Sequence, residues 1–212
     1  VHVLRGERAE AERHYHRLID AFNDGRVSAE NGRGMGAVAA AARALGAIKD
    51  ANQSFAEATR AAPNDVEIER AWAELFLDKY DTKNAERSIA RILTLNPKDA
   101  KAIERLARIR LEQGADFAQV DKMLGDALAV NPALVSAHVS LAGLALRDME
   151  LEQAGKHLDE ALRINPRDLE ALSVRAAQFL LADDRAAFER AIATILEENA
   201  RYSRAFTTIA TY

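Results

Sequence analysis

Residues 93–100 read LTLNPKDA, and two variants follow, LAVNPALV at residues 128–135 and LRINPRDL at residues 162–169. Each variant combines apolar residues with an Asn-Pro pair. The chain contains only four prolines, and they stand 34, 35 and 34 residues apart, at Pro63, Pro97, Pro132 and Pro166. A nearly constant period of this length indicates an internal structural repeat.

Three further sets of residues follow the same period. The first set consists of alanines: Ala39, Ala73, Ala107, Ala142, Ala176 and Ala210. The second set is mostly small: Ala51, Ala85, Val120, Ala154 and Phe188. The third set is larger and apolar: Phe55, Ile89, Leu124, Leu158 and Ile192. Several registers that share one period make a chance repetition very improbable.

Each repeat has room for two helices of about 14 residues and two turns. Between residues 65 and 96, apolar residues recur at helical spacing in two stripes: Ile68, Trp72, Leu75 and Phe76, then Ala85, Ile89, Ile92 and Leu93. Alanine is abundant, whereas glycine and proline are scarce, which favours helices throughout. The sequence therefore predicts an all-α chain of helix pairs.

The Asn-Pro stretch is expected to end one helix and start the next. Proline cannot continue a helix, and asparagine tolerates the left-handed conformation. We therefore expect three asparagines to end helices in that conformation: Asn96, Asn131 and Asn165. The aspartates that follow three of the prolines are expected to cap the next helix: Asp65, Asp99 and Asp168. Gly46 and Gly114 mark the tighter turn inside two units.

The period and registers resemble the tetratricopeptide repeat, whose unit is a 34-residue helix-turn-helix. The stretch GAIKDANQSFAEATRAAPND at residues 46–65 carries the resemblance, as does LEQAGKHLDEALRINPRD at residues 151–168. The resemblance implies a right-handed α-solenoid of antiparallel helix pairs over residues 1–212. The implied parts are a partial unit at 1–31, full units at about 32–65, 66–99, 100–134, 135–168 and 169–202, and a terminal helix at 203–212.

Some residues depart from the family pattern. Glu69 and His138 stand where the family prefers a large apolar residue, and Arg175 stands where it usually has leucine. The junction FNDGRVSAENGRG at residues 22–34 lacks the Asn-Pro signal. A narrower likeness links residues 71–109 to large bacterial repeat proteins that carry a metallopeptidase domain further on. The sequence itself contains no H-E-x-x-H zinc motif.

Composition excludes several classes of protein. The 212 residues carry a net charge of −4 with mixed signs, which gives no reason to expect nucleic acid as a partner. The absence of cysteine excludes disulfides and thiol catalysis. No apolar run approaches the length that membrane insertion requires. The first residues, VHVLRGERAEAE, do not form a signal peptide and are typical of the end of a helix, so we expect a segment of a longer protein.

No group of residues indicates catalysis, a cofactor or a metal. His2 stands alone, and His14 and His16 diverge on a helix because they are two residues apart. His138 is expected to be an interior residue without a ligand partner, and His157 is expected to face solvent. The glycine-rich NGRGMG at residues 31–36 lacks the Lys-Ser/Thr of a phosphate-binding loop. The adjacent carboxylates Glu197 and Glu198 do not converge as an acid/base pair.

In the resembled family the first helix of each pair lines the concave surface, which binds a partner. Position by position, this implies two sets of candidate partner-binding residues. The first set is charged: Glu67, Arg70, Glu74, Lys101, Glu104, Arg105 and Arg108. The second set is small and weakly polar: Ser136, Val139, Ser140, Gly143, Ser173, Ala177 and Thr207. Glu67 and Arg70 are also spaced to pair with each other, for about 0.2–0.5 kcal/mol.

The sequence therefore predicts a non-enzymatic scaffold that binds a peptide or protein segment in a concave groove. One alternative is the substrate-positioning region of a larger enzyme such as a metallopeptidase. Another is a self-assembly module, because the last stretch, SRAFTTIATY, is expected to present Phe206, Ile209 and Ala210 at an uncapped end. The lysine-and-asparagine set by which some relatives hold a C-terminal carboxylate is not evident.

Overall fold

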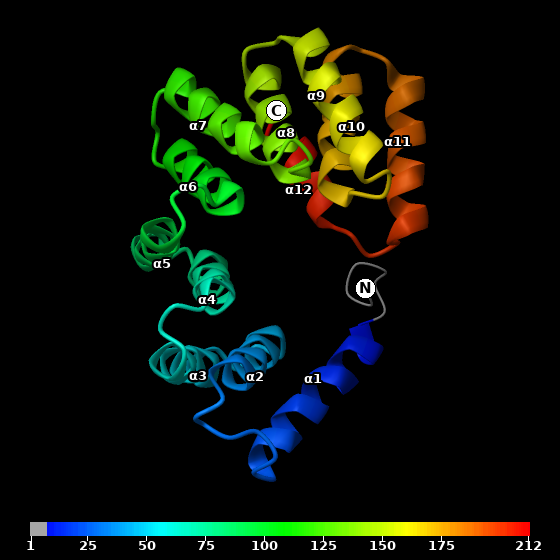
Figure 1. Ribbon diagram of the computed structural model, residues 1–212. Coiled ribbons are helices and arrows are strands. Elements are labelled where there is room, and N and C mark those ends of the chain that lie inside the picture. Colours follow the sequence, from blue (N-terminus) through cyan, green and yellow to red (C-terminus); the bar gives the residue numbers. More distant parts are fainter. Residues whose placement is uncertain (1–7) are drawn as a thin grey trace. The chain divides into compact units, whose positions relative to one another are not determined.

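The computed structural model describes residues 8–212, which form twelve α-helices and no β-strand (Figure 1). His2 and the rest of residues 1–7 lie outside the described residues. Within residues 8–212, no helix has the length and apolarity that crossing a membrane requires.

The chain divides into two compact units, one ending at Ala102 and the other running from Ile103 to Tyr212. The first contains α1 (Arg8–Asn23), α2 (Gly32–Ala44), α3 (Ile48–Ala61), α4 (Val66–Asp78), α5 (Thr82–Leu95) and the start of α6 (Ala100–Glu112). The second contains the rest of α6, α7 (Phe117–Val130), α8 (Val135–Arg147), α9 (Leu151–Ile164), α10 (Leu169–Leu181), α11 (Arg185–Glu198) and α12 (Arg204–Ile209).

Consecutive helices in each unit pack as antiparallel pairs, seen most clearly for α2 with α3, α8 with α9 and α10 with α11 (Figure 1). The predicted all-α class and the helix pairing are confirmed. The division into repeat units within one solenoid over residues 1–212 stays a prediction.

The periodic registers form the core. The alanines of the first register that lie inside helix pairs are at most 2% exposed: Ala39, Ala73, Ala107, Ala142 and Ala176. Their small side chains let the paired helices approach closely. The large apolar register fills the space between them, through Phe55, Ile89, Leu124 and Leu158. Ile192 and Phe188 are only half-buried, so burial decreases in the last pair.

The asparagines before the prolines do not adopt the left-handed conformation, and that expectation was wrong. Asn96, Asn131 and Asn165 have φ near −140°, −134° and −135°, with extended backbones. The reason is that the proline ring favours an extended conformation in the preceding residue. Each asparagine side chain instead accepts a hydrogen bond from the N–H two residues ahead, at Lys98, Ala133 and Arg167. This Asx turn ends the helix.

The predicted aspartate caps are confirmed. Asp65 accepts from the N–H groups of Glu67 and Ile68, Asp99 from Ala102, and Asp168 from Ala171. Each carboxylate satisfies helix N–H groups that have no partner within the helix, typically for about 1 kcal/mol.

The turn inside each pair uses one residue in the left-handed region. Gly46 and Gly114 occupy this position with φ of 80° and 82°, as their glycine identity predicted. In the same register the other pairs carry side chains: Tyr80, Met149 and Asp183, with φ between 55° and 58°. Nothing in the residue types of these three positions predicted that they share the glycine conformation.

The last helix is not presented to solvent as a whole, in contrast to the expectation for residues 203–212. Ile209 is buried in a cluster with Ala177, and Tyr212 packs against that cluster. Phe206, at 56% exposed, and Ala210 do face solvent. The difference arises because α12 lays one side against α10, so only its opposite side stays open.

Candidate functional site

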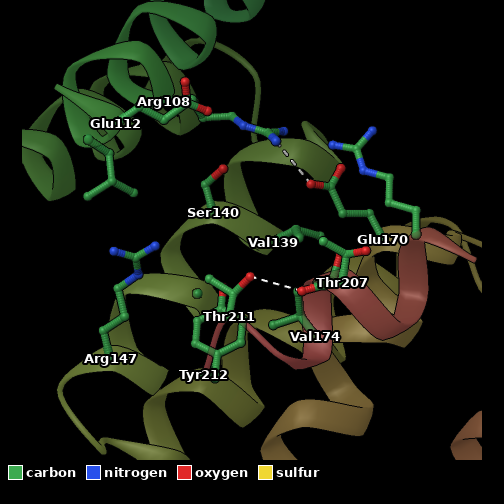
Figure 2. Close-up of a pocket in the computed structure, with 14 residues that line it drawn as sticks. Arg108, Glu112, Val139, Ser140, Arg147, Glu170, Val174, Thr207, Thr211 and Tyr212 are labelled. Atoms are coloured by element: carbon green, nitrogen blue, oxygen red, sulfur yellow. Dashed lines mark hydrogen bonds and ion pairs between the residues drawn. The ribbon is translucent and has the colours of Figure 1, made fainter.

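The second unit contains a cavity of about 500 Å³ whose wall residues come from four helices and the residues after α12 (Figure 2). We call it the α6–α12 cavity. It is lined by Arg108, Leu111, Glu112, Val139, Ser140, Gly143, Arg147, Glu170, Val174, Arg204, Thr207, Thr208, Thr211 and Tyr212. The helices α6, α8, α10 and α12 alternate with α7, α9 and α11, so the cavity lies on the face formed by every second helix.

A charged network holds Arg108 at one wall of the cavity. Its guanidinium lies 3.2 Å from Glu170 and 3.8 Å from Glu104. Glu104 is only 2% exposed, and the Ser140 hydroxyl donates to it at 3.4 Å. Burial raises the pKa of Glu104, although Arg105 and Arg108 lower it. Burial lowers the pKa of Arg108, but Glu170 and Glu104 raise it more. Arg108 therefore stays charged, and the carboxylates of Glu170 and Glu104 largely neutralise this charge.

Two other arginines at the cavity differ from Arg108 because they have no ion-pair partner within the described chain. Arg147 comes from the end of α8, and Arg204 begins α12. Figure 2 shows Arg147 and Tyr212 on the same side of the cavity. The cavity thus has two cationic groups available to an incoming anion.

Tyr212 occupies the floor of the cavity beside α8. A Cβ atom at position 143 would overlap the Tyr212 hydroxyl, so glycine is needed there for this packing. Burial raises the pKa of Tyr212 against the opposing effect of Arg147, so the hydroxyl stays protonated at neutral pH. The cavity therefore offers hydroxyl groups from tyrosine, serine and threonine next to its arginines.

Five of the predicted partner-binding residues come together at this cavity: Arg108, Val139, Ser140, Gly143 and Thr207. Others of the second unit do not line it. Ser173 and Ala177 are buried, and the Ser173 hydroxyl donates to the Leu169 carbonyl. Glu104 is buried behind Arg108, while Arg105 and Ser136 are half-buried outside the lining.

The remaining predicted residues belong to the first unit. The expected Glu67–Arg70 pair forms at 3.4 Å, and Arg70 also pairs with Asp99 at 3.0 Å. Glu67 and Lys101 are exposed, and Glu74 is half-buried. The charge of Arg70 is therefore already met within its own unit, and a partner-binding role for this set stays a prediction.

The residues that the sequence reasoning missed lie one helical turn from residues that it named. Arg147 follows Val139 and Gly143 at intervals of four, and Arg204, Thr208 and Thr211 share a helical stripe with Thr207. Extending each stripe by one turn would have found them. Tyr212 gave no such signal, because its position depends on how the residues after α12 fold.

Two other features have structural explanations. The glycines of NGRGMG serve packing, because a Cβ at Gly32 would meet Ala62 and one at Gly36 would press on Ile68. A second cavity of about 470 Å³ lies in the first unit, lined by residues of α1, α2 and α3 that include His16. Within residues 8–212, no group of three or more histidine, cysteine or acidic residues is placed to hold a metal ion.

No family model matches the sequence, and no curated protein matches it significantly. Solved structures of tetratricopeptide repeat proteins do match the fold. One is a thermophilic protein of Thermus thermophilus, with a TM-score of 0.71 and 19% identity over 85% of this chain and 97% of that chain. A chain of the APC/C hetero-tetramer Cut9–Hcn1 matches with a TM-score of 0.77 and 14% identity over 97% of this chain and 40% of that one.

A third similar structure is YrrB, described as a protein of the same kind with an unusual peptide-binding site. It matches with a TM-score of 0.52 and 10% identity, over 90% of this chain and 96% of that chain. At these identities the likeness concerns the arrangement of the helices alone.

Proposed function

We propose that this chain, which has the tetratricopeptide-repeat fold, is a non-enzymatic scaffold that binds an acidic segment of another protein in the α6–α12 cavity. Scaffolds of this fold typically mediate protein–protein interactions. YrrB carries a peptide-binding site, and Cut9 and Hcn1 form a hetero-tetramer. In the family the first helices of the pairs face the partner, and the cavity is lined by such helices, α6, α8, α10 and α12.

The observation that carries the proposal is the pair of arginines without ion-pair partners in the described chain, Arg147 and Arg204, at the cavity. The chain as a whole has a net charge of −4, so the positive charge of these two arginines is confined to the cavity. It would therefore direct an acidic segment to this place. Guanidinium groups bind carboxylates with two parallel hydrogen bonds, and Ser140 and Thr207 offer further polar contacts. A volume of about 500 Å³ lies within the range typical of ligand sites.

A peptide series tests this proposal. Fluorescein-labelled hexaglutamate, hexaserine and hexalysine are titrated with the chain and followed by fluorescence anisotropy at low and high salt. We expect hexaglutamate to bind most tightly and to lose affinity as salt screens the charges. The double variant Arg147→Glu/Arg204→Glu should weaken hexaglutamate binding by at least about tenfold, because both attractions become repulsions.

The matched control is Arg185→Glu/Arg190→Glu, which makes the same two charge reversals at exposed residues of α11 away from the cavity. It should leave the affinity within about twofold of wild type, since exposed charges at a distance are screened. Equal loss in the control and in Arg147→Glu/Arg204→Glu, or equal binding of all three peptides, contradicts the proposal.

A further inference from the structure

His138 on α8 and His157 on α9 face each other across the helix pair. Their Nδ1 atoms are 3.5 Å apart, and the ring centroids are 5.8 Å apart with the planes inclined by 41°. His138 is 9% exposed and His157 is half-buried. The expectation that His138 has no histidine partner and that His157 faces solvent was therefore wrong. Their separation of 19 residues hid the contact, because it depends on how α9 turns against α8.

The hydrogen bonds define which nitrogen of His138 carries the proton. Its Nε2 lies 3.0 Å from the carbonyl oxygen of Pro132. A carbonyl oxygen only accepts, so Nε2 must donate a hydrogen. In the neutral imidazole the other nitrogen, Nδ1, then carries a lone pair, and this lone pair points towards His157.

His157 has a matching arrangement. Its Nε2 lies 3.4 Å from the Nε2 atom of Gln153, one turn earlier on α9. In this orientation the amide donates to His157 Nε2, and the Nδ1–H group of His157 donates to Nδ1 of His138. An amide presents either its oxygen or its nitrogen after a half-turn, so Gln153 accepts from an Nε2–H as readily as it donates to Nε2. With the amide oxygen facing Nε2, the Nδ1 atom of His157 also presents a lone pair. In this second arrangement the two lone pairs lie 3.5 Å apart, and a metal ion can take the place of the proton between the rings.

We propose that the Nδ1 atoms of His138 and His157 form a binding site for one divalent transition-metal ion. Metal–imidazole bonds are about 2.0–2.1 Å long, which at a tetrahedral angle separates two ligand nitrogens by about 3.4 Å. The observed 3.5 Å needs almost no rearrangement for a tetrahedral ion such as Zn²⁺, and a closure of about 0.6 Å for the tetragonal geometry of Cu²⁺. The bond from His138 Nε2–H to a backbone carbonyl is the support that metal-binding histidines usually have.

The electrostatic surroundings agree with a cation at this point. Burial and His138 lower the pKa of His157, although Asp121 raises it. Asp121 belongs to α7, and Glu160, whose carboxylate also interacts with His138, lies one turn after His157. No third protein ligand within residues 8–212 completes the set, so water fills the other positions.

The pair is not required for helix packing. In the same repeat register, the other positions hold Met35 with Ser54, Glu69 with Ser88, Ile103 with Met123, and Leu172 with Ala191. Two of these four pairs are apolar, so an apolar contact suffices to join the helices. The imidazoles therefore add a chemical property that stacking alone does not need. Among divalent ions, a site of imidazole nitrogens favours Cu²⁺ over Ni²⁺ and Zn²⁺.

Isothermal titration of the untagged 212-residue chain with CuCl₂, NiCl₂ and ZnCl₂, in a buffer that does not chelate metals, tests this site. We expect one Cu²⁺ per chain and weaker binding of Ni²⁺ and Zn²⁺. His138→Leu, which places the leucine of position 172 in this register, and His157→Ala should each lower the Cu²⁺ affinity by at least about tenfold. Circular dichroism confirms that the variants fold, and the Cu²⁺ electron paramagnetic resonance spectrum should show coupling to two imidazole nitrogens.

The control is the double variant His14→Ala/His16→Ala, which removes two exposed histidines of α1 and should leave the tight Cu²⁺ site intact. Absence of saturable binding of all three ions overturns the proposal. Binding that survives both His138→Leu and His157→Ala, or that disappears in the α1 control instead, also overturns it. None of these outcomes depends on the peptide experiment.

Discussion

At the scale of single residues, polar side chains replace an apolar one at equivalent places in two helix pairs. Glu69 on α4 and His138 on α8 occupy the same register, and both are buried. His138 reaches the carbonyl of Pro132, while in the α4–α5 pair Arg91 reaches the equivalent carbonyl of Pro63 at 3.4 Å. In both the α4–α5 pair and the α8–α9 pair, a polar side chain of the pair thus lies within hydrogen-bond distance of a backbone carbonyl in the turn that precedes the first helix.

The buried side chain of Glu69 has fewer hydrogen-bond partners than that of His138. Its Oε1 lies 3.1 Å from Arg91 Nε, yet the geometry is not that of a hydrogen bond. Both carboxylate oxygens are buried without a hydrogen-bond partner within the described chain. The distance and the missing hydrogen bond together indicate an electrostatic contact that only partly offsets the cost of burying the charge.

We therefore expect Glu69→Leu to leave stability unchanged or to raise it by about 1–4 kcal/mol, because it removes a buried charge and restores an apolar contact. Arg91→Ala should lower stability by about 1–3 kcal/mol, because it leaves the buried carboxylate alone; the half-exposed position of Arg91 limits the loss. Urea denaturation measures both. If Glu69→Leu proves as destabilising as Arg91→Ala, Glu69 contributes net stability and the interpretation is wrong.

Met149 gives a second prediction at this scale. It is 60% exposed and has a left-handed φ of 58° at the position where Gly46 and Gly114 stand in other pairs. Met149→Gly should stabilise the chain by about 0.5–1 kcal/mol, because relief of the strain exceeds the extra entropy of an unfolded glycine. Gly114→Ala should be destabilising by about 1 kcal/mol or more. Thermal unfolding that shifts both variants in the same direction would contradict this reasoning.

At the scale of elements, the turn between α5 and α6 is stabilised by a half-buried ionic contact. The Asp99 carboxylate caps α6 through Ala102 N–H at 2.9 Å and accepts from both terminal nitrogens of Arg70 at 3.2 and 3.0 Å. Burial raises the pKa of Asp99, but Arg70 and the Ala102 N–H lower it more, so the net pKa lies below the ordinary value.

A carboxyl group whose pKa is lower in the folded state stabilises the fold above its unfolded pKa. The stabilisation by Asp99 should therefore be complete at neutral pH and decline as pH falls below about 4 and through the folded pKa. Asp99→Asn keeps an acceptor for the cap and removes the charge, so it should cost about 1.5–3 kcal/mol at pH 7 and progressively less in acid.

Urea denaturation of both proteins between about pH 3 and pH 7 measures this difference. Asp20→Asn, at an exposed residue of α1, serves as the control and should show no such trend. A difference between Asp99→Asn and wild type that stays constant with pH would show that the Arg70 contact contributes nothing to the cap.

Some features of these elements could be predicted from the sequence, and others could not. The 34-residue period predicted the helix pairs, and the aspartate caps followed from local chemistry. The extended Asn96 was missed because its conformation is set by Pro97 rather than by the asparagine. The His138–His157 contact and the Tyr212 floor were missed for another reason. Both depend on how one helix turns against another, and periodicity along a single helix does not define that rotation.

At the scale of the whole chain, Phe206 is the main apolar residue that α12 leaves open. We expect self-association at high concentration to depend on it, because burying an exposed aromatic ring is favourable. Light scattering against concentration should show association of the wild type that Phe206→Ser reduces and Leu95→Ser, at an exposed residue of α5, does not. A wild type that scatters as a monomer at every concentration would rule this out.

Gly143 has a consequence for what the α6–α12 cavity accepts. The Tyr212 hydroxyl lies against α8 because position 143 has no side chain. A single methyl group at that position would act as a wedge that lifts the ring from α8, whereas truncating the ring would deepen the chamber while leaving both arginines in place. The residue at position 143 therefore sets the depth of the cavity without changing the charge of the cavity. Gly143 and Tyr212 would select a partner by size, whereas Arg147 and Arg204 would select it by charge.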